Sequence, residues 1–293
     1  MNDKMKNLAV RTLSGLVLVA VMLGLMIWSP NGFAILLAVL LVAGMLEFYA
    51  LAAAKGSRPQ RILGTALGLA LFCIALLPAM PDGCDVFDNR WIGALIALFV
   101  LAVPVMLVCE LYRKNADPLA SVGATLLGVW YVAFPLLCFG WMAFLSGSSG
   151  EWFPGVALAY LVIIWVNDVF AYLVGMAFGR HRLFERLSPK KSWEGFFGGA
   201  VGAVAAGLAA GRWLDGDLRA WGGLALLVAV TGVLGDLTES MFKRSASVKD
   251  SGRSIPGHGG VLDRFDAVLL SAPFALVYLI LCNWMFDIRF FNC

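Results

Sequence analysis

Charged residues are scarce in this sequence: only 14% of the 293 residues are Asp, Glu, Lys or Arg, while 61% are hydrophobic. An ordinary soluble domain carries about 25% charged residues. No polar stretch between the apolar segments is long enough to bury a core of its own, so a separate soluble domain does not fit. The composition therefore indicates a polytopic membrane protein.

Metal-binding sulfur and imidazole groups are also sparse. The chain has six cysteines and two histidines, without a Cys-x-x-Cys pair and without cysteine beside histidine at ligand spacing. The cysteines are interpreted as small apolar residues, and a zinc site is not indicated. The net charge of +3 gives no bulk basic character, so nucleic acid is not expected as a partner.

Apolar segments, by contrast, recur along the whole chain, and about 20 such residues make one membrane crossing. Nine crossings are predicted, at residues 11–28, 32–54, 62–80, 91–111, 121–145, 153–178, 195–214, 221–242 and 264–286. We therefore expect an all-α, polytopic integral membrane protein with about nine transmembrane helices. Residues 1–293 are predicted to form a single transmembrane domain.

The distribution of basic residues predicts the orientation, because Lys and Arg collect on the cytoplasmic side of membrane proteins. If the N-terminus is cytoplasmic, all but four of the 22 Lys and Arg residues fall on the inner face. The exceptions are Arg90, Arg212, Arg219 and Arg289. A missed or invented crossing would scramble this alternation. The sequence thus predicts a cytoplasmic N-terminus and an external C-terminus.

Two predicted inner loops combine basic residues with acids, residues 179–195 and residues 243–266. Anionic lipid headgroups would attract the basic residues but repel the acids. An ionised side chain at the centre of a membrane helix costs about 2.5 to 3.5 kcal/mol, so such a residue usually faces a cavity or a partner. Asp168, with Asn167 beside it, lies inside a predicted crossing and is one example.

Four other acids are spaced to meet on helix faces. Asp236 and Glu239 are three residues apart and should share one face, with Lys243 one turn further along. Asp263 and Asp266 repeat this spacing at the start of the last crossing. Two other interpretations stay open: the acids pair with nearby Lys or Arg, or Asp263 caps the last helix.

Carboxylates, basic residues and glycines together suit phosphate chemistry. Mg²⁺ binds through one or two carboxylates plus substrate phosphates, while Lys and Arg neutralise phosphate oxygens. Gly257, Gly259 and Gly260 would let backbone N–H groups approach an anion, although a simple turn explains them as well. His258 between them fits a phosphate contact or a structural role equally. The pattern indicates phosphoryl or nucleotidyl transfer.

The run SMFKRSASVKDSGRSIPGHGGVLDRFD, residues 240–266 and called here the signature segment, resembles the signature of the phosphatidate cytidylyltransferases, or CDP-diacylglycerol synthases. It contains Ser, a Lys-Arg pair, a Lys-Asp pair after four intervening residues, His-Gly-Gly and Asp-Arg-x-Asp. A second run, WVNDVFAYLVGMAFGRHRLFERLSPKKSWEG, is similar to the family in its Asn-Asp and in Ser-Pro-Lys-Lys followed by Glu-Gly. Residues 1–150 match only in general character, so residues 151–293 are expected to hold the catalytic spans and loops.

The resemblance implies transfer of a cytidylyl group from CTP to phosphatidate, with Mg²⁺, giving CDP-diacylglycerol and pyrophosphate for phospholipid synthesis. It places the active site at the cytoplasmic face of a bacterial-type inner membrane, among membrane lipids. The residue chemistry agrees, because phosphatidate brings an ionised oxygen as nucleophile and needs no strong general base. Catalysis then depends on holding the phosphates in line and neutralising the leaving pyrophosphate. A homodimer is left open.

Residue roles follow from the two runs. Metal ligands are expected first at Asp236 and Asp263, then at Glu239, Asp250 and Asp266. Phosphate contacts are expected from Lys243, Arg244, Lys249 and Arg264. The central catalytic group is Asp236, Asp263, Lys243 and Arg264. Further substrate contacts are expected from Asn167, Asp168, Ser188, Lys190, Lys191, His258, Gly259 and Gly260.

Two other classes of membrane protein would also use intramembrane acids. The CDP-alcohol phosphotransferases carry an Asp-Gly-x-x-Ala-Arg pattern that this sequence lacks. A cation-coupled transporter would place its charges near the membrane midplane and pair broken helices in two halves. Here the charge is expected near the inner face, which favours the transferase.

Overall fold

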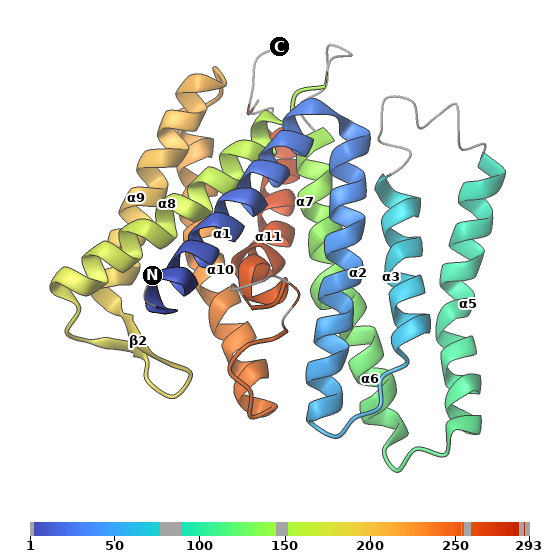
Figure 1. Ribbon diagram of the computed structural model, residues 1–293. Coiled ribbons are helices and arrows are strands. Elements are labelled where there is room, and N and C mark those ends of the chain that lie inside the picture. The colour runs from blue at the N-terminus through green and yellow to red at the C-terminus, as the bar shows by residue number, and fades with distance from the viewer. Residues whose placement is uncertain are drawn as a thin grey trace. The chain divides into compact units, whose positions relative to one another are not determined.

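The structure is a computed structural model that describes residues 3–76, 89–144, 152–252, 254, 259–286 and 290, and these are helical almost throughout (Figure 1). Among these described residues, six helical segments are long and apolar enough to cross a membrane: α2 (Pro30–Ala54), the continuous segment Pro118–Phe144, α8 (Gly155–Phe178), α9 (Trp193–Trp213), α10 (Leu218–Ser245) and α11 (Leu262–Phe286). The predicted all-α, polytopic membrane architecture is confirmed at this level.

The other described helices are α1 (Asp3–Trp28), α3 (Arg61–Leu76) and α5 (Asn89–Arg113). The segment Pro118–Phe144 consists of α6 (Pro118–Gly128), the π-helix η2 (Val129–Ala133) and α7 (Phe134–Phe144). Six of the nine predicted crossings thus correspond to helical segments that could span a membrane, and the other three, 11–28, 62–80 and 91–111, overlap α1, α3 and α5.

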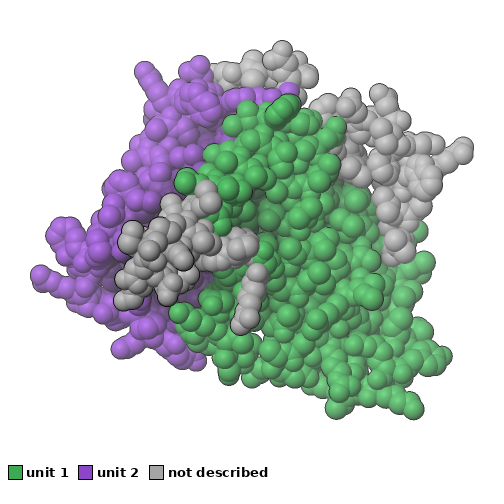
Figure 2. Space-filling view, in the orientation of Figure 1, with its two compact units in different colours: residues 1–140, 242–265 green, residues 141–241, 266–293 purple. Residues whose placement is uncertain are grey.

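The chain divides into two compact units (Figure 2). Unit 1 comprises residues 1–140 and 242–265, and unit 2 comprises residues 141–241 and 266–293. Most of the signature segment, from residue 242 to residue 265, therefore belongs with the N-terminal helices. The acids at positions 236, 239 and 266 belong to unit 2.

Within unit 1, α2 packs against α1, α3 and η2. The helix begins where Ser29 accepts a hydrogen bond from the N–H of Gly32 and Pro30 occupies the first turn. Near its end, the ring of Phe48 packs on those of Tyr131 and Phe242, at centroid distances of 5.6 and 5.7 Å. This aromatic group fixes the start of residues 242–265 against α2 and η2.

Within unit 2, α8 and α9 run side by side (Figure 1). Glycines of α9 allow their backbones to approach closely, as small residues do between membrane helices. A Cβ atom at Gly199 would lie 2.8 Å from the backbone oxygen of Asn167, and one at Gly195 would lie 2.7 Å from that of Ala171. This contact places the second half of α8, with Asp168, beside the start of α9.

A short hairpin joins these two helices, where the sequence predicted a loop. Strand β1 (Arg182–Phe184) pairs antiparallel with β2 (Ser188–Ser192), which leads directly into α9. Ser192 accepts a hydrogen bond from the N–H of Gly195 and caps α9. Nδ1 of His181 lies 2.6 Å from Oε1 of Glu194, and the N–H of His181 also donates to Glu194. The hairpin is thereby attached to the first turn of α9.

Candidate functional site

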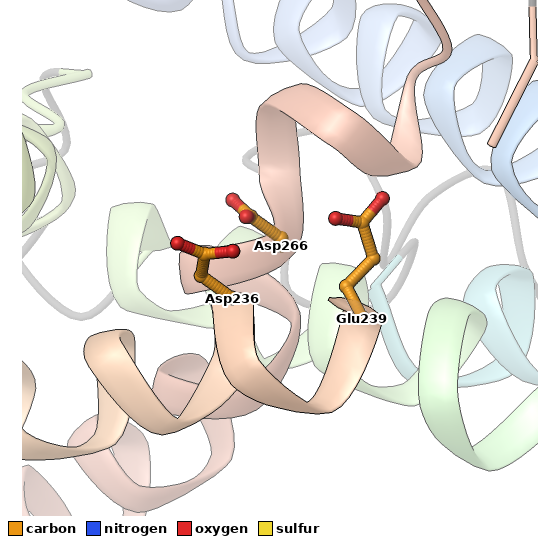
Figure 3. A group of neighbouring side chains, drawn as sticks. All are labelled: Asp236, Glu239 and Asp266. Carbon is orange, nitrogen blue, oxygen red and sulfur yellow. The ribbon is translucent and has the colours of Figure 1, made fainter. Parts of the chain in front are cut away.

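Three carboxylates of unit 2 form an acidic cluster: Asp236 and Glu239 from α10, and Asp266 from α11 (Figure 3). One oxygen of each lies within 4.8 Å of the others. The spacing of three residues puts Asp236 and Glu239 on one face of α10. Gly235 lets α11 come close, because a Cβ atom there would lie 2.4 Å from the backbone oxygen of Asp266. Glu239 is only 1% exposed.

The acidic cluster fits a divalent cation. Mg²⁺ binds oxygen ligands at about 2.0–2.1 Å, so opposite ligands lie about 4.2 Å apart. The three carboxylate oxygens lie within 4.8 Å of one another, which is close to this distance between ligands. Small side-chain movements would bring them to the spacing that Mg²⁺ requires. Three carboxylates held together, one of them buried, also carry negative charge that a cation would offset. Asp236, Glu239 and Asp266 could therefore hold a metal ion.

A cavity of about 380 Å³ lies beside Asp236 in unit 2. Its charged lining consists of Asp168, Lys190, Lys191 and Asp236. Nζ of Lys191 forms an ion pair with Asp236, so β2 and α10 meet at this point. The rest of the lining includes the apolar groups Tyr172, Met176, Leu183 and Phe196. The cavity thus has charged and apolar walls.

Two predicted residues near this cavity are not part of its lining. Asn167 is buried on α8, and its Oδ1 atom has no hydrogen-bond partner among the described residues. A Cβ atom at Gly199 would lie 2.8 Å from that oxygen, which shows how closely α9 covers it. Ser188 begins β2 and is paired in register with Phe184.

Asp263 is engaged separately, within unit 1. Its Oδ1 atom accepts a hydrogen bond from Nζ of Lys243 at 2.7 Å. Its Oδ2 atom accepts from the N–H of Ser251 at 3.0 Å, from Oγ of Ser251 at 2.9 Å and from the N–H of Gly260 at 2.9 Å. Gly259 has a φ of +86°, a conformation that favours glycine. The Asp263 carboxylate therefore links Lys243, Ser251 and Gly260 of the signature segment.

The other charged residues of the signature segment are placed as follows. Arg244, Lys249, Asp250 and Arg264 are exposed. His258 lies outside the described residues. The structure thus brings Asp236, Glu239 and Asp266 together in one cluster, and Lys243, Asp263 and Gly260 in another set of contacts.

One residue that the sequence analysis did not single out joins the second set. Glu47 is buried on α2 and accepts hydrogen bonds from the backbone N–H groups of Val261 and Leu262. It is the only charged residue in the 25-residue helix α2. That isolation within an apolar span is the signal that could have identified it.

The known proteins that this chain resembles are cytidylyltransferases. The sequence model described as "Cytidylyltransferase family" matches residues 9–282. The phosphatidate cytidylyltransferase of a Synechocystis species is 31% identical over 297 residues, covering 92% of this chain and 96% of the relative. That of Staphylococcus epidermidis is 35% identical over 223 residues, covering 75% of this chain and 80% of the relative. That of Staphylococcus aureus is 38% identical over 178 residues, covering 60% and 66% respectively.

Proposed function

The chain belongs to the cytidylyltransferase family, and we therefore propose that it transfers the cytidylyl group of CTP to phosphatidate. The products are CDP-diacylglycerol and pyrophosphate, and the role is membrane phospholipid synthesis. The observation that carries the proposal is the match to a phosphatidate cytidylyltransferase over nearly the full length of both chains. The cavity with charged and apolar walls supports it, because one substrate is a lipid and the other a nucleotide.

The reaction exchanges one bond to phosphorus for another. An oxygen of the phosphatidate phosphate attacks the α-phosphorus of CTP, and the bond from that phosphorus to the oxygen bridging to the β-phosphate breaks. Pyrophosphate leaves with the electron pair of this bond. The attacking oxygen is already ionised at neutral pH, so no strong base is needed. Positioning and charge neutralisation supply the catalysis.

The residues around the cavity suit these tasks. Lys190 and Lys191 carry positive charge to the cavity, where phosphate oxygens would be held. Asp236, Glu239 and Asp266 would hold Mg²⁺, which when bound would neutralise charge on the triphosphate. Tyr172 and its apolar neighbours would lie beside the lipid. We include Asp168 and Asn167 on α8 as polar groups that shape this site.

Lys243, Arg244, Lys249 and Arg264 are proposed as phosphate contacts from the signature segment, with Gly259, Gly260 and His258 as further contacts. Asp263 and Asp250 remain in the proposal as additional acids of the site.

We also propose nine crossings, a cytoplasmic N-terminus, an external C-terminus and a site at the cytoplasmic face of a bacterial inner membrane. This orientation supports access of CTP from the cytoplasm while the acyl chains stay in lipid.

The direct test uses purified protein in mixed micelles with labelled CTP and phosphatidate, with and without Mg²⁺. We expect CDP-diacylglycerol and pyrophosphate in equal amounts, only when Mg²⁺ is present. ATP in place of CTP, and diacylglycerol in place of phosphatidate, serve as controls and should give no product. Absence of CDP-diacylglycerol from a well-folded preparation would refute the proposed activity.

A further inference from the structure

Glu47 is a buried carboxylate inside an apolar helix of unit 1, with 6% of its surface exposed. Its Oε1 atom accepts hydrogen bonds from Oγ of Ser254 at 2.5 Å and from the N–H of Val261 at 3.0 Å. Its Oε2 atom accepts from the N–H of Leu262 at 3.0 Å and lies 3.3 Å from Oγ of Ser251. A buried carboxylate is tolerated when donors satisfy it in this way. All four donors come from the signature segment.

Two glycines of the signature segment leave room for this carboxylate. A Cβ atom at Gly252 would lie 2.6 Å from Cδ of Glu47, and one at Gly260 would lie 2.3 Å from its Oε2 atom. A side chain at either position would force the Glu47 carboxylate to move, because real Cβ contacts under 3.0 Å essentially do not occur. The segment therefore closes around Glu47 with backbone on two sides.

Glu47 also supports the beginning of α11. The first N–H groups of a helix have no acceptor within the helix and need one from elsewhere. Val261 and Leu262 lie at this beginning, and both N–H groups donate to Glu47. A negative charge at this end of a helix is favourable as well. A side chain of α2 therefore does what a local capping residue usually does.

Ser251 connects Glu47 with Asp263. Its Oγ atom lies 2.9 Å from Oδ2 of Asp263 and 3.3 Å from Oε2 of Glu47, so the hydroxyl group is within hydrogen-bond distance of both carboxylates. The same Oδ2 atom accepts the N–H of Gly260, the residue directly before Val261. Lys243 completes the set by donating to Oδ1 of Asp263. Moving Glu47 would thus displace the groups that hold Asp263.

We propose that Glu47 is a positioning residue for the cytidylyl transfer: it holds Ser251, Ser254, Val261 and Leu262 so that Asp263 and Lys243 keep their places. This inference rests on the proposed function. It gives the N-terminal helices a specific part in the reaction, through one carboxylate on α2. Glu47 touches no reacting atom in this proposal and acts only through the segment that it holds.

The test compares Glu47→Gln with Glu47→Asp. Gln keeps the size of the side chain but replaces one acceptor oxygen by a donor. That donor would face either the donors of Val261 and Ser254 or those of Leu262 and Ser251. Asp keeps the charge and both acceptors but is one methylene shorter. We expect kcat to fall about 10–100-fold in Glu47→Gln, the range typical of removing a partner that orients a functional group, and to fall less in Glu47→Asp. A role in filling space predicts the opposite order.

Glu110→Gln is the matched control. Glu110 is equally buried in unit 1, at 7% exposed, and accepts hydrogen bonds from Gln60, Arg113 and Asn115 instead of the signature segment. We expect it to lower the melting temperature in detergent without changing kcat per folded molecule. Hydrogen–deuterium exchange supplies a second measurement. The amides of Ser251, Gly260, Val261 and Leu262 should exchange faster in Glu47→Gln but not in Glu110→Gln.

Three results would overturn the inference. They are parental kcat and amide protection in Glu47→Gln, a higher kcat in Glu47→Gln than in Glu47→Asp, and equal losses of kcat in Glu47→Gln and Glu110→Gln. If Glu47→Gln does not fold, Ser254→Ala removes one of the four contacts and should give a smaller loss of kcat with faster exchange at Val261. A parental protein that makes no CDP-diacylglycerol would refute the proposed function instead, and the exchange measurement would still show whether Glu47 holds the segment.

Discussion

Lys243 and Asp263, 20 residues apart in the chain, form an ion pair of 2.7 Å in unit 1 whose side chains are only 13% and 8% exposed. Backbone and hydroxyl donors fill the remaining acceptor positions of Asp263. A buried pair of this kind is costly to break, because the remaining charge loses the partner that compensated its burial.

Asp263→Asn should therefore lower stability as well as activity. Breaking a buried ion pair costs about 3–5 kcal/mol. We expect a clear drop in melting temperature in detergent, a similar drop for Lys243→Met, and less than the sum of both in the double variant. Glu185→Gln, on the exposed hairpin, is the control and should melt like the parent. A parental melting temperature with an altered Mg²⁺ dependence would instead favour Asp263 as a metal ligand.

The acidic cluster predicts a cation site that can be measured without turnover. Mn²⁺, followed by electron paramagnetic resonance, should bind the parental protein in the absence of CTP. Asp236→Asn, Glu239→Gln and Asp266→Asn should each weaken this binding about tenfold or more, because each removes one anionic ligand. Glu110→Gln should bind Mn²⁺ normally. Unchanged binding in all three cluster variants would exclude a cation site there.

The close contact of α8 and α9 predicts that Gly199 does not tolerate a methyl group. In Gly199→Ala the new Cβ atom would lie 2.8 Å from two oxygens of Asn167, and overpacking of this kind costs about 1–3 kcal/mol. Gly123→Ala is the control, because a Cβ atom there meets nothing within 4 Å. Its stability should rise by about 0.4–1 kcal/mol, since alanine restricts the unfolded chain. Equal melting temperatures for both variants would contradict the tight contact.

The proposed orientation predicts which loops an impermeant thiol reagent reaches in intact cells. Cysteines placed in a cysteine-free background at Glu185 and Arg219 flank α9 on opposite ends. We expect labelling at position 219 and none at position 185 before the cells are opened. Ser148 and Cys293, which should also face outward, lie outside the described residues. External labelling at position 185 would reverse the orientation and separate the proposed site from CTP.

Part of the candidate site follows directly from helical periodicity. The spacing of Asp236 and Glu239 predicts a shared face, and the structure adds Asp266 to it. Asp263 and Asp266 have the same spacing, yet Asp263 is held by Lys243 and Ser251 instead. Periodicity fixes the direction of a side chain from its own helix, but its partners depend on which segments pack around that helix. That part of the site could not be read from the sequence.

The fold, like the site, is predicted from the sequence only in part. Apolar length predicts the helices well, because the cost of burying backbone polar groups in lipid leaves few alternatives to helix. It does not predict the π-helix Val129–Ala133 inside one apolar segment, nor the hairpin from Arg182 to Ser192. Both depend on local hydrogen bonds that apolar content does not determine. Glu47 was missed for a related reason, since its donors lie more than 200 residues away.

The distance in sequence between Glu47 and its donors has a consequence for how the protein is made. Glu47 and the N–H of Val261 are separated by 214 residues. At about 5–20 residues per second, the ribosome adds Val261 about 10–40 s after it has added Glu47. During that time α2 enters the membrane with a carboxylate whose donors do not yet exist. Until residues 251–262 emerge, the unfinished chain therefore has to carry this group either protonated or beside water, lipid headgroups or the insertion machinery.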